Sequence, residues 1–254
     1  MSASSASTRP LLEIACFDGK SGIHAAEGGA DRIELCHDYK SGGLSPDPAV
    51  LVELKAQVDI PVYVMIRPRP NDFFYNNEEF QVMKSTIITL GKVGADGFVF
   101  GILSSVSSEI DVNRNKQLVQ LAGGKPCTFH RAFDCIPEQN WGTSLSQLAE
   151  CGFSSILTSG GPSGNTAMEC IAKLGELFQQ VDLVQSRMAS GFRVPEIIVG
   201  GGVRSSNVQL LWEETQARVF HSSALVSSSQ FASAGEVRAL LQSLQGPSIP
   251  NNVQ

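Results

Sequence analysis

The sequence has little positive charge. Its 254 residues include 19 lysines and arginines against 25 aspartates and glutamates, a net charge of −6, and the basic residues form no long run. Binding to nucleic acid or to an anionic membrane requires a strong positive field. We therefore expect no nucleic acid and no membrane among the partners of this chain.

The start of the chain has no long apolar run, and the cysteines have no dense spacing. Residues 1–10 are rich in serine and alanine, and they do not contain the apolar stretch of a secretory signal or a membrane span. The six cysteines are scattered through the acidic chain, which does not suit a disulfide framework. We expect reduced thiols, a cytoplasmic location with the nucleus also compatible, and a disordered tail over residues 1–10.

No nucleotide-binding glycine loop follows the first apolar run, which ends in Cys16-Phe17-Asp18-Gly19. This argues against a doubly wound open sheet. Short β-prone runs instead alternate with helical stretches at a spacing of roughly 30 residues, which is typical of βα units. The predicted strands are Leu11–Cys16, Arg32–Cys36, Val62–Arg67, Gly97–Gly101, Pro126–His130, Ser154–Thr158, Glu196–Gly200 and Arg218–Ser222.

Helical stretches separate these eight runs. They are Lys20–Gly28, Asp47–Val58, Asn77–Val93, Asn113–Leu121, Ser144–Cys151, Asn165–Leu183, Ser205–Thr215 and Gly235–Leu244. Eight βα units predict a single α/β domain, a closed (β/α)8 barrel over residues 11–245. Residues 246–254 are expected to form a flexible C-terminal tail.

Polar residues follow the predicted strands at their carboxyl ends, where such barrels carry their working sites. Glu34, Arg67, His130 and His221 hold such positions, and Asp134 follows His130 closely enough to orient it as a general base. If the protein is an enzyme, these five residues are the catalytic candidates. Two simpler interpretations remain open: the arginine forms only a structural ion pair, and the histidines are only hydrogen-bonded in the barrel mouth.

Several residues are candidates for binding an anion. Two prolines stiffen the segment Met65-Ile66-Arg67-Pro68-Arg69-Pro70, and two glycine-rich turns can bring backbone amides close to an anion. The predicted anion-binding residues are Arg67, Arg69, Ser159, Gly160, Gly201, Gly202 and Ser222. The glycines can equally serve only to form tight turns.

Cys16 and Cys36 end the first two predicted strands, which are neighbours in a barrel. Two thiolates that lie close together suit the soft ion Cu(I) better than Mg²⁺ or Ca²⁺. The pair forms no Cys-x-x-Cys motif, so two ordinary buried thiols are the alternative.

Together these motifs resemble the CutC family. The similarity rests on Ile33-Glu34-Leu35-Cys36, on Met65 to Arg69 with Asp72-Phe73, on Thr128 to Asp134, on Leu157-Thr158-Ser159-Gly160, on Gly200 to Val203, and on Phe220 to Ala224, and it spans Leu11 to about Leu225. Pro70-Asn71 replaces the pair of glycines usual in the family. Ser104 to Ser108 replaces an acidic turn, and the segment after Val226 matches poorly.

The resemblance implies a TIM-type barrel that is cytoplasmic, self-associating as a dimer or tetramer, and linked to copper homeostasis. It also implies Cu(I) bound through Cys16 and Cys36. Two functions therefore stay open. One is a Cu(I)-binding homeostasis protein, and the other is an enzyme that acts on a small phosphorylated or carboxylated metabolite. A scaffold that binds partner proteins is a third alternative, without an apolar stripe in the sequence to support it.

Overall fold

The computed structural model describes residues 9–104, 108–226 and 229–245. Within these residues the chain alternates between strands and helices, as the sequence predicts. The strands are β1 (Leu11–Cys16), β2 (Arg32–Leu35), β3 (Val62–Met65), β4 (Gly97–Phe100), β5 (Cys127–Phe129), β6 (Ser155–Thr158), β7 (Glu196–Val199) and β8 (Val219–Ser222).

An α-helix follows each strand. The helices are α1 (Gly19–Gly28), α2 (Pro48–Lys55), α3 (Asn77–Lys92), α4 (Val112–Leu121), α5 (Trp141–Cys151), α6 (Ile171–Arg187), α7 (Val208–Thr215) and α8 (Ala234–Ser243). Three short 3-10 helices lie in the connections, namely η1 (Tyr39–Ser41), η2 (Arg131–Cys135) and η3 (Glu138–Asn140).

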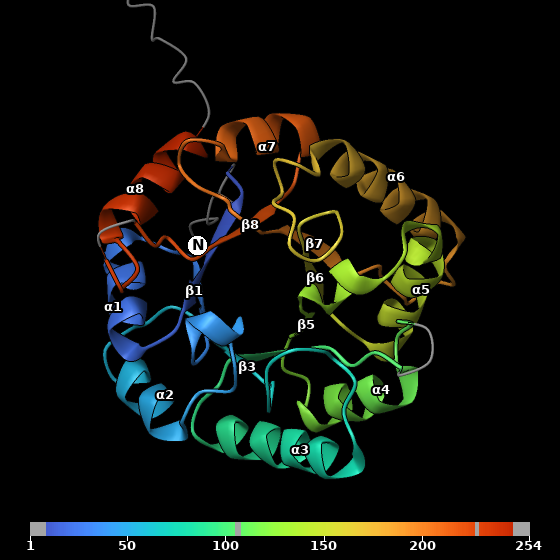
Figure 1. Ribbon diagram of the computed structural model, residues 1–254, viewed down its shortest axis with the longest axis horizontal. Helices are drawn as coiled ribbons and strands as arrows, with labels where there is room; N and C mark the ends of the chain where they lie inside the picture. The colour runs from blue at the N-terminus through green and yellow to red at the C-terminus, as the bar shows by residue number, and fades with distance from the viewer. Residues whose placement is uncertain (1–8, 105–107, 227–228, 246–254) are drawn as a thin grey trace, which may run out of the picture.

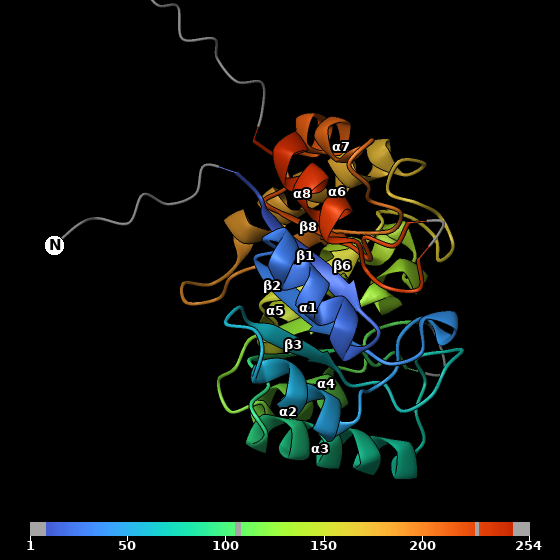
Figure 2. The ribbon, with the colours of Figure 1, turned by 90° about the vertical axis from the view of Figure 1, so that its left-hand side faces the viewer.

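The sheet is a closed barrel in which every strand is parallel to its neighbours in chain order. It closes where β8 pairs with β1, with Glu13 opposite His221. Figure 1 looks along the barrel and shows the helices as a ring around the strands. In the side view of Figure 2, the long loops gather at the end toward which the β1 arrow points. These observations confirm the predicted (β/α)8 barrel.

Side chains along each strand alternate between two apolar layers because successive residues of a strand point to opposite faces. Ile14 and Cys16 belong to the large core cluster that also contains the buried residues of the helices. Smaller clusters fill the barrel interior, one of them around Cys36 and Met65. Glu13 lies between the outward-facing residues of β1 and therefore points into the barrel.

The strands end one or two residues earlier than predicted at several places. Three residues that were predicted to close strands instead lie one or two positions beyond the ends of β2, β3 and β5, namely Cys36, Arg67 and His130. Their backbone amides still bond to the neighbouring strand or loop; the His130 amide, for example, donates to the Phe100 carbonyl at 3.1 Å. These three side chains thus remain at the barrel mouth.

Helix α6 begins at Ile171, six residues later than predicted, and ends at Arg187. The preceding turn is held in another conformation because the Thr166 amide and hydroxyl both donate to Glu169 Oε2 at 2.8 Å. The Ala167 amide donates to the Gly201 carbonyl at 2.8 Å. The segment is therefore bonded to the turn after β7 and does not extend α6.

Most of the two predicted tails lies outside the described residues. Of residues 1–10 only Arg9 and Pro10 are described, and Arg9 forms an ion pair with Asp31 at 2.7 Å. Residues 246–254, and positions 105–107 of the serine-rich loop, are also outside. In the part of the chain that is described, no helix is long and apolar enough to span a membrane.

Replacement of Gly160 by alanine should destabilise the barrel more than the same change at Gly164. Both glycines have positive φ, 79° and 101°, so both changes cost about 1–2 kcal/mol of backbone strain. A Cβ atom at Gly160 would lie 2.4 Å from Leu174 Cγ, whereas one at Gly164 would meet open space. We expect about 1–3 kcal/mol of further loss for Gly160→Ala, measured by urea denaturation; equal losses would contradict this packing argument.

Candidate functional site

A cavity of about 110 Å³ lies at the mouth of the barrel, and we call it the inner cavity. Its lining includes Glu34, Cys36, Met65, Arg67, His130 and His221. A wider hollow of about 400 Å³, the outer recess, shares four wall residues with it, namely Gly42, Arg67, Phe73 and Arg131. A third hollow, of about 580 Å³, is lined by residues of α5 and α6 and their flanking segments, and its lining includes none of the strand-end residues.

Four of the five predicted catalytic residues meet at the inner cavity: Glu34, Arg67, His130 and His221. Asp134 lies elsewhere, and its carboxylate is engaged by other partners. Arg131 Nε donates to it at 2.6 Å and Thr158 Oγ1 donates to it at 2.5 Å. The structure therefore gives Asp134 the role of fixing Arg131 and the end of β6, and it does not bring Asp134 to the His130 ring.

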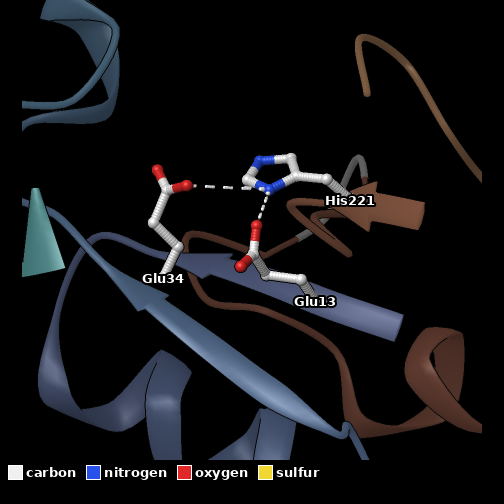
Figure 3. Close-up of side chains that lie close together, drawn as sticks. All are labelled: Glu13, Glu34 and His221. Carbon is white, nitrogen blue, oxygen red and sulfur yellow. Dashed lines mark hydrogen bonds and ion pairs between the residues drawn. The ribbon is translucent and has the colours of Figure 1, made fainter. Parts of the chain in front are cut away.

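A buried charged cluster lies at β1, β2 and β8 (Figure 3), and two of its members, Glu34 and His221, line the inner cavity. Glu13 receives a hydrogen bond from Arg32 Nε at 2.6 Å and shares a second bond, 2.8 Å long, with His221 Nδ1. Glu34 Oε2 lies 3.8 Å from the same nitrogen. One imidazole thus lies between two carboxylates, and one of these carboxylates is paired with an arginine.

This environment separates the pKa values of the two carboxylates. Burial favours protonation of Glu13, but the Arg32 charge and the bond to His221 outweigh it and lower the pKa to about 2. For Glu34, burial and the nearby Glu13 raise the pKa despite the opposing effect of His221. Burial lowers the pKa of His221, yet the bond to Glu13 and the Glu34 charge raise it overall. Glu13 is therefore a fixed anion, whereas the raised pKa values of Glu34 and His221 suit these two groups to hold and exchange a proton.

Sequence reasoning missed Glu13 and Arg32. Glu13 stands in the middle of an otherwise apolar strand, Leu11–Cys16, and an acidic residue is rarely buried without a partner. That single charge, on the same strand face as Ala15, was the signal that could have identified it. Arg32 could have been found as the required counter-ion on the neighbouring strand.

His130 is neutral and has a defined tautomer. Burial and then the Arg67 charge lower its pKa to about 3. Its Nδ1 accepts a hydrogen bond from the Ala132 amide at 3.2 Å, so the ring proton must be on Nε2. The sequence proposed His130 as a general base, but in this environment it is better suited to donate a hydrogen bond.

Arg67 is fixed by carbonyl groups of two loops. Its Nη1 atom donates to the Ser41 and Gly43 carbonyls at 2.9 and 3.1 Å, and Nη2 donates to the Asn71 carbonyl at 3.3 Å. The Phe73 ring lies 5.0 Å from the guanidinium carbon. These hydrogen bonds all go to neutral carbonyl groups, and among the described residues no carboxylate pairs with this guanidinium, so its charge remains available to an anionic ligand.

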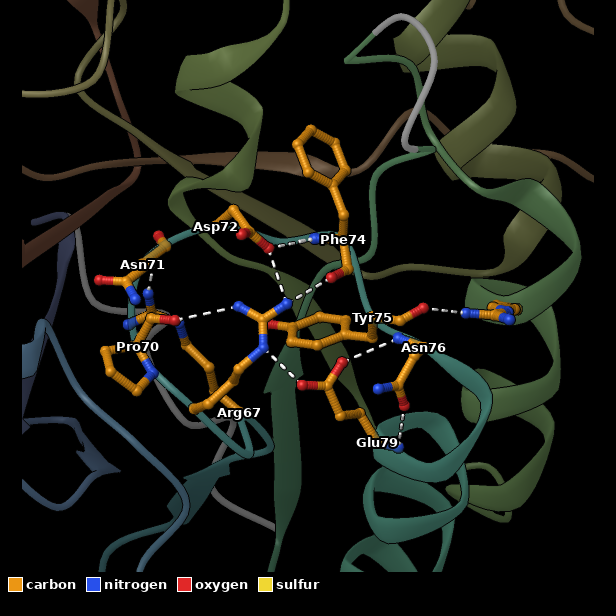
Figure 4. Close-up of polar contacts among 10 residues, drawn as sticks. Arg67, Pro70, Asn71, Asp72, Phe74, Tyr75, Asn76 and Glu79 are labelled. Carbon is orange, nitrogen blue, oxygen red and sulfur yellow. Dashed lines mark hydrogen bonds and ion pairs between the residues drawn. The ribbon is translucent and has the colours of Figure 1, made fainter.

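Arg69, the other predicted anion-binding arginine, stabilises the loop after β3. Its partners Asp72 and Glu79 are labelled in Figure 4. Its Nε donates to Glu79 at 2.5 Å, and its Nη2 donates to Asp72 at 2.9 Å. Glu79 also belongs to the capping box of α3 with Asn76. The charge of Arg69 is therefore neutralised within the loop.

The predicted anion-binding turns lie at the mouth, but most of their polar groups have partners inside the protein. The Ser159 amide donates to Asp134 at 3.2 Å. The Gly160 amide donates to Thr158 Oγ1 at 2.9 Å, and Ser222 Oγ donates to the Val203 carbonyl at 2.7 Å. Gly201 has positive φ, and a Cβ there would lie 3.6 Å from the Arg131 guanidinium. Gly202 also has positive φ. Anion binding by these turns stays a prediction.

The two strand-end thiols lie on different sides of the sheet. Cys16 packs in the layer between the strands and the helices, and its Sγ donates to the Ile14 carbonyl at 3.5 Å. Cys36 lines the inner cavity, and its Sγ donates to Glu34 Oε1 at 3.3 Å. Burial and nearby carboxylates raise the pKa of both thiols well above the ordinary value. All six cysteines are free.

Oxygen and nitrogen atoms of Glu13, Glu34 and His221 lie within 4.8 Å of one another, close enough to surround a metal ion. Two carboxylates and an imidazole suit a hard or borderline divalent ion better than Cu(I). The Arg32 guanidinium, 2.6 Å from Glu13, opposes the approach of a cation. The cluster is therefore better explained as a group of side chains that share protons than as a metal site.

The Glu13→Gln change should destabilise the folded protein by about 3–5 kcal/mol at neutral pH because it leaves the Arg32 charge buried without its counter-ion. The pKa of Glu13 in the folded state is below the ordinary 4.5, so its contribution is present above pH 4.5 and is lost as the pH falls toward 2. The difference in unfolding free energy between wild type and variant should shrink over that interval. Glu196→Gln, at an exposed position of β7, is the control; a Glu13 variant as stable as this control would contradict the prediction.

Comparison with known proteins supports one relationship. The CutC family matches residues 11–226. The human protein named copper homeostasis protein cutC homolog is 39% identical over 214 residues, which cover 84% of this chain and 73% of the human protein. A family protein CutC from Enterobacter sp. is 40% identical over 200 residues, 79% of this chain and 74% of that protein.

A solved CutC structure from Streptococcus agalactiae superimposes with a TM-score of 0.75 at 32% identity, and the match covers 84% of this chain and 98% of that one. The matched segment contains the eight strands and every side chain of the inner cavity. This chain belongs to the CutC family.

Proposed function

We propose that this protein acts in copper homeostasis by binding Cu(I) at the barrel mouth through Cys36 and Cys16. The observation that carries the proposal is the position of Cys36, which lines the inner cavity beside Met65 and His221. Thiolate and thioether sulfur are the ligands that Cu(I) prefers, and imidazole also suits copper. Relatives named copper homeostasis proteins support the same role.

Cu(I) binding must release the Cys36 proton because the thiolate is the ligand form. Burial, followed by the Glu34 carboxylate, raises the pKa of this thiol well above its ordinary value. The ion supplies the positive charge that the buried thiolate lacks. Glu34 Oε1, already 3.3 Å from Sγ, is the nearest acceptor for the displaced proton.

Cys16 can join the site only if its side chain turns. The Cys36 amide donates to the Cys16 carbonyl at 2.8 Å, so the two backbones are in contact. The Cys16 thiol, however, is fully buried in the outer layer. We therefore propose Cys36 as the first ligand and Cys16 as a second ligand that leaves its contact with the Ile14 carbonyl.

Cu(I) titration with a competing chelator, under anaerobic conditions, tests this order. Cys36→Ser should weaken binding by about 100-fold or more because it removes the soft ligand that lines the cavity. Cys16→Ser should weaken it less, by about tenfold. Cys127→Ser, at another buried thiol, is the matched control and should bind as wild type does. Wild-type affinity in the Cys16→Ser/Cys36→Ser double variant would eliminate the proposal.

A cytoplasmic location belongs to this proposal because the thiols must stay reduced to bind Cu(I). Self-association as a dimer or tetramer is likewise proposed, from the resemblance to the family. Light scattering on the purified chain measures its mass in solution against the 27.2 kDa of one chain.

A second candidate function is an enzyme that acts on a small anionic metabolite at the same mouth. The specific observation in its favour is the separation of the Glu13 and Glu34 pKa values beside His221. Glu13 occupies His221 Nδ1, which leaves Nε2 as the atom that can exchange a proton with a ligand. Glu34 and His221 then serve as acid and base, and Arg67 attracts the anion.

Hydrogen–deuterium exchange into small carboxylated and phosphorylated metabolites tests this second function by NMR. An acid–base pair next to a bound oxo or hydroxy acid should exchange hydrogen at the adjacent carbon, and Glu34→Gln and His221→Gln should each reduce the rate by about 100-fold or more. Glu236→Gln, outside the inner cavity, is the control. Exchange at the uncatalysed rate with every compound would count against the enzyme.

A further inference from the structure

Three polar atoms at the inner cavity have no hydrogen bond within the described residues. They are Glu34 Oε2, Arg67 Nε and His130 Nε2. Each belongs to a side chain that is at most 6% exposed. A buried polar group without a partner costs about 1–3 kcal/mol, so three of them around one cavity indicate a ligand that completes their bonding.

Two of these atoms are donors. His130 carries its proton on Nε2 because Nδ1 accepts from the Ala132 amide, and an arginine Nε always carries one. The Tyr75 hydroxyl lies close to the Arg67 guanidinium and interacts with it, but neither this hydroxyl nor Arg67 Nε forms a hydrogen bond of good geometry. Phe73 packs against both donors, with its ring 4.7 Å from the His130 ring and 5.0 Å from the Arg67 guanidinium. The donors are thus held in place before any ligand arrives.

Across the inner cavity from His130, the wall carries a hydrogen-bond acceptor, Glu34, beside His221. Glu34 and His221 come from β2 and β8, which flank β1, whereas β5, which precedes His130, stands across the closed barrel from β1. Glu34 Oε2 needs a donor when it is ionised and can itself donate when it is protonated. A hydroxyl or carbonyl group on the ligand satisfies it in either state.

We infer that the inner cavity binds a short 2-hydroxy- or 2-oxocarboxylate, with the carboxylate held by His130 Nε2 and the Arg67 guanidinium and the second oxygen at Glu34 and His221. Two donors match the two oxygens of a carboxylate. A phosphate dianion offers more acceptors than this wall has free donors, and it would approach Glu13 and Glu34 with a larger repulsion. The volume of about 110 Å³ limits the ligand to a few carbon atoms.

From the second candidate function this inference takes only the location of the ligand. It does not require that the protein convert the ligand to a product. His130 acts in it as a neutral donor. That role differs from the acid–base role of Glu34 and His221, and it requires the Nε2 proton to stay in place.

Calorimetric titration of the full chain with glycolate tests the inference, and glycolamide, inorganic phosphate and malonate serve as comparison ligands. Glycolate should bind, and glycolamide, which lacks the charge, should bind at least about tenfold more weakly. His130→Phe keeps a ring against Phe73 but removes the donor, so it should weaken glycolate binding at least about tenfold. His130→Gln, which returns an N–H near the position of Nε2, should restore part of the affinity.

Arg69→Lys is a control that should bind glycolate as the wild type does, because Arg69 lies on the same loop as Arg67 but lines neither hollow. If His130→Phe does not fold, the ¹⁵N signal of Nε2 in the wild type gives the same information, since it should shift on glycolate addition and remain that of a protonated nitrogen. Three outcomes overturn the inference: no binding of glycolate, equal affinity in His130→Phe, or binding of phosphate in preference to carboxylates. Cu(I) titration and hydrogen–deuterium exchange test the two proposed functions without measuring glycolate binding. A failure of the carboxylate inference is therefore distinguishable from a failure of either proposed function.

Discussion

The ion pair between Arg32 and Glu13 determines the chemistry of the barrel mouth. Its two groups come from adjacent strands and approach to 2.6 Å, where the carboxylate is fully buried. A charge in such a place is tolerated only with a close partner. Because the arginine keeps Glu13 ionised, Glu13 can fix the His221 ring, and the repulsion between the carboxylates contributes to the raised pKa of Glu34. Substituting any one of these four residues would therefore change the pKa values of the titratable groups that remain.

The order of the strands and helices, and most strand bounds, could be predicted from the sequence. β1 has the predicted bounds, and the other strands differ by no more than two residues at an end. The reason is physical: each strand is a short β-prone run, and helix starts are marked by residues such as Asp18 and Asn76, whose side chains accept from the first helical turn. The convergence of Glu34, Arg67, His130 and His221 followed from the same topology.

The direction of side chains at the mouth could not be predicted from the sequence. Asp134 follows His130 in sequence, but the 3-10 turn η2 directs its carboxylate toward Arg131 and Thr158. Cys16 ends β1 and Cys36 directly follows β2, yet alternation along β1 sends the Cys16 thiol outward. Position at a strand end places a residue at the mouth, whereas the direction of its side chain depends on backbone geometry and on competing hydrogen bonds that spacing does not encode.

The grip of three carbonyl groups on Arg67 links two segments of chain. Ser41 and Gly43 belong to the connection after β2, and Asn71 belongs to the connection after β3. A single guanidinium thus connects, through hydrogen bonds, two loops that flank both the inner cavity and the outer recess. A ligand that contacts Arg67 from within the barrel therefore touches the group that holds both loops, and a displacement of this guanidinium would break hydrogen bonds in each of them.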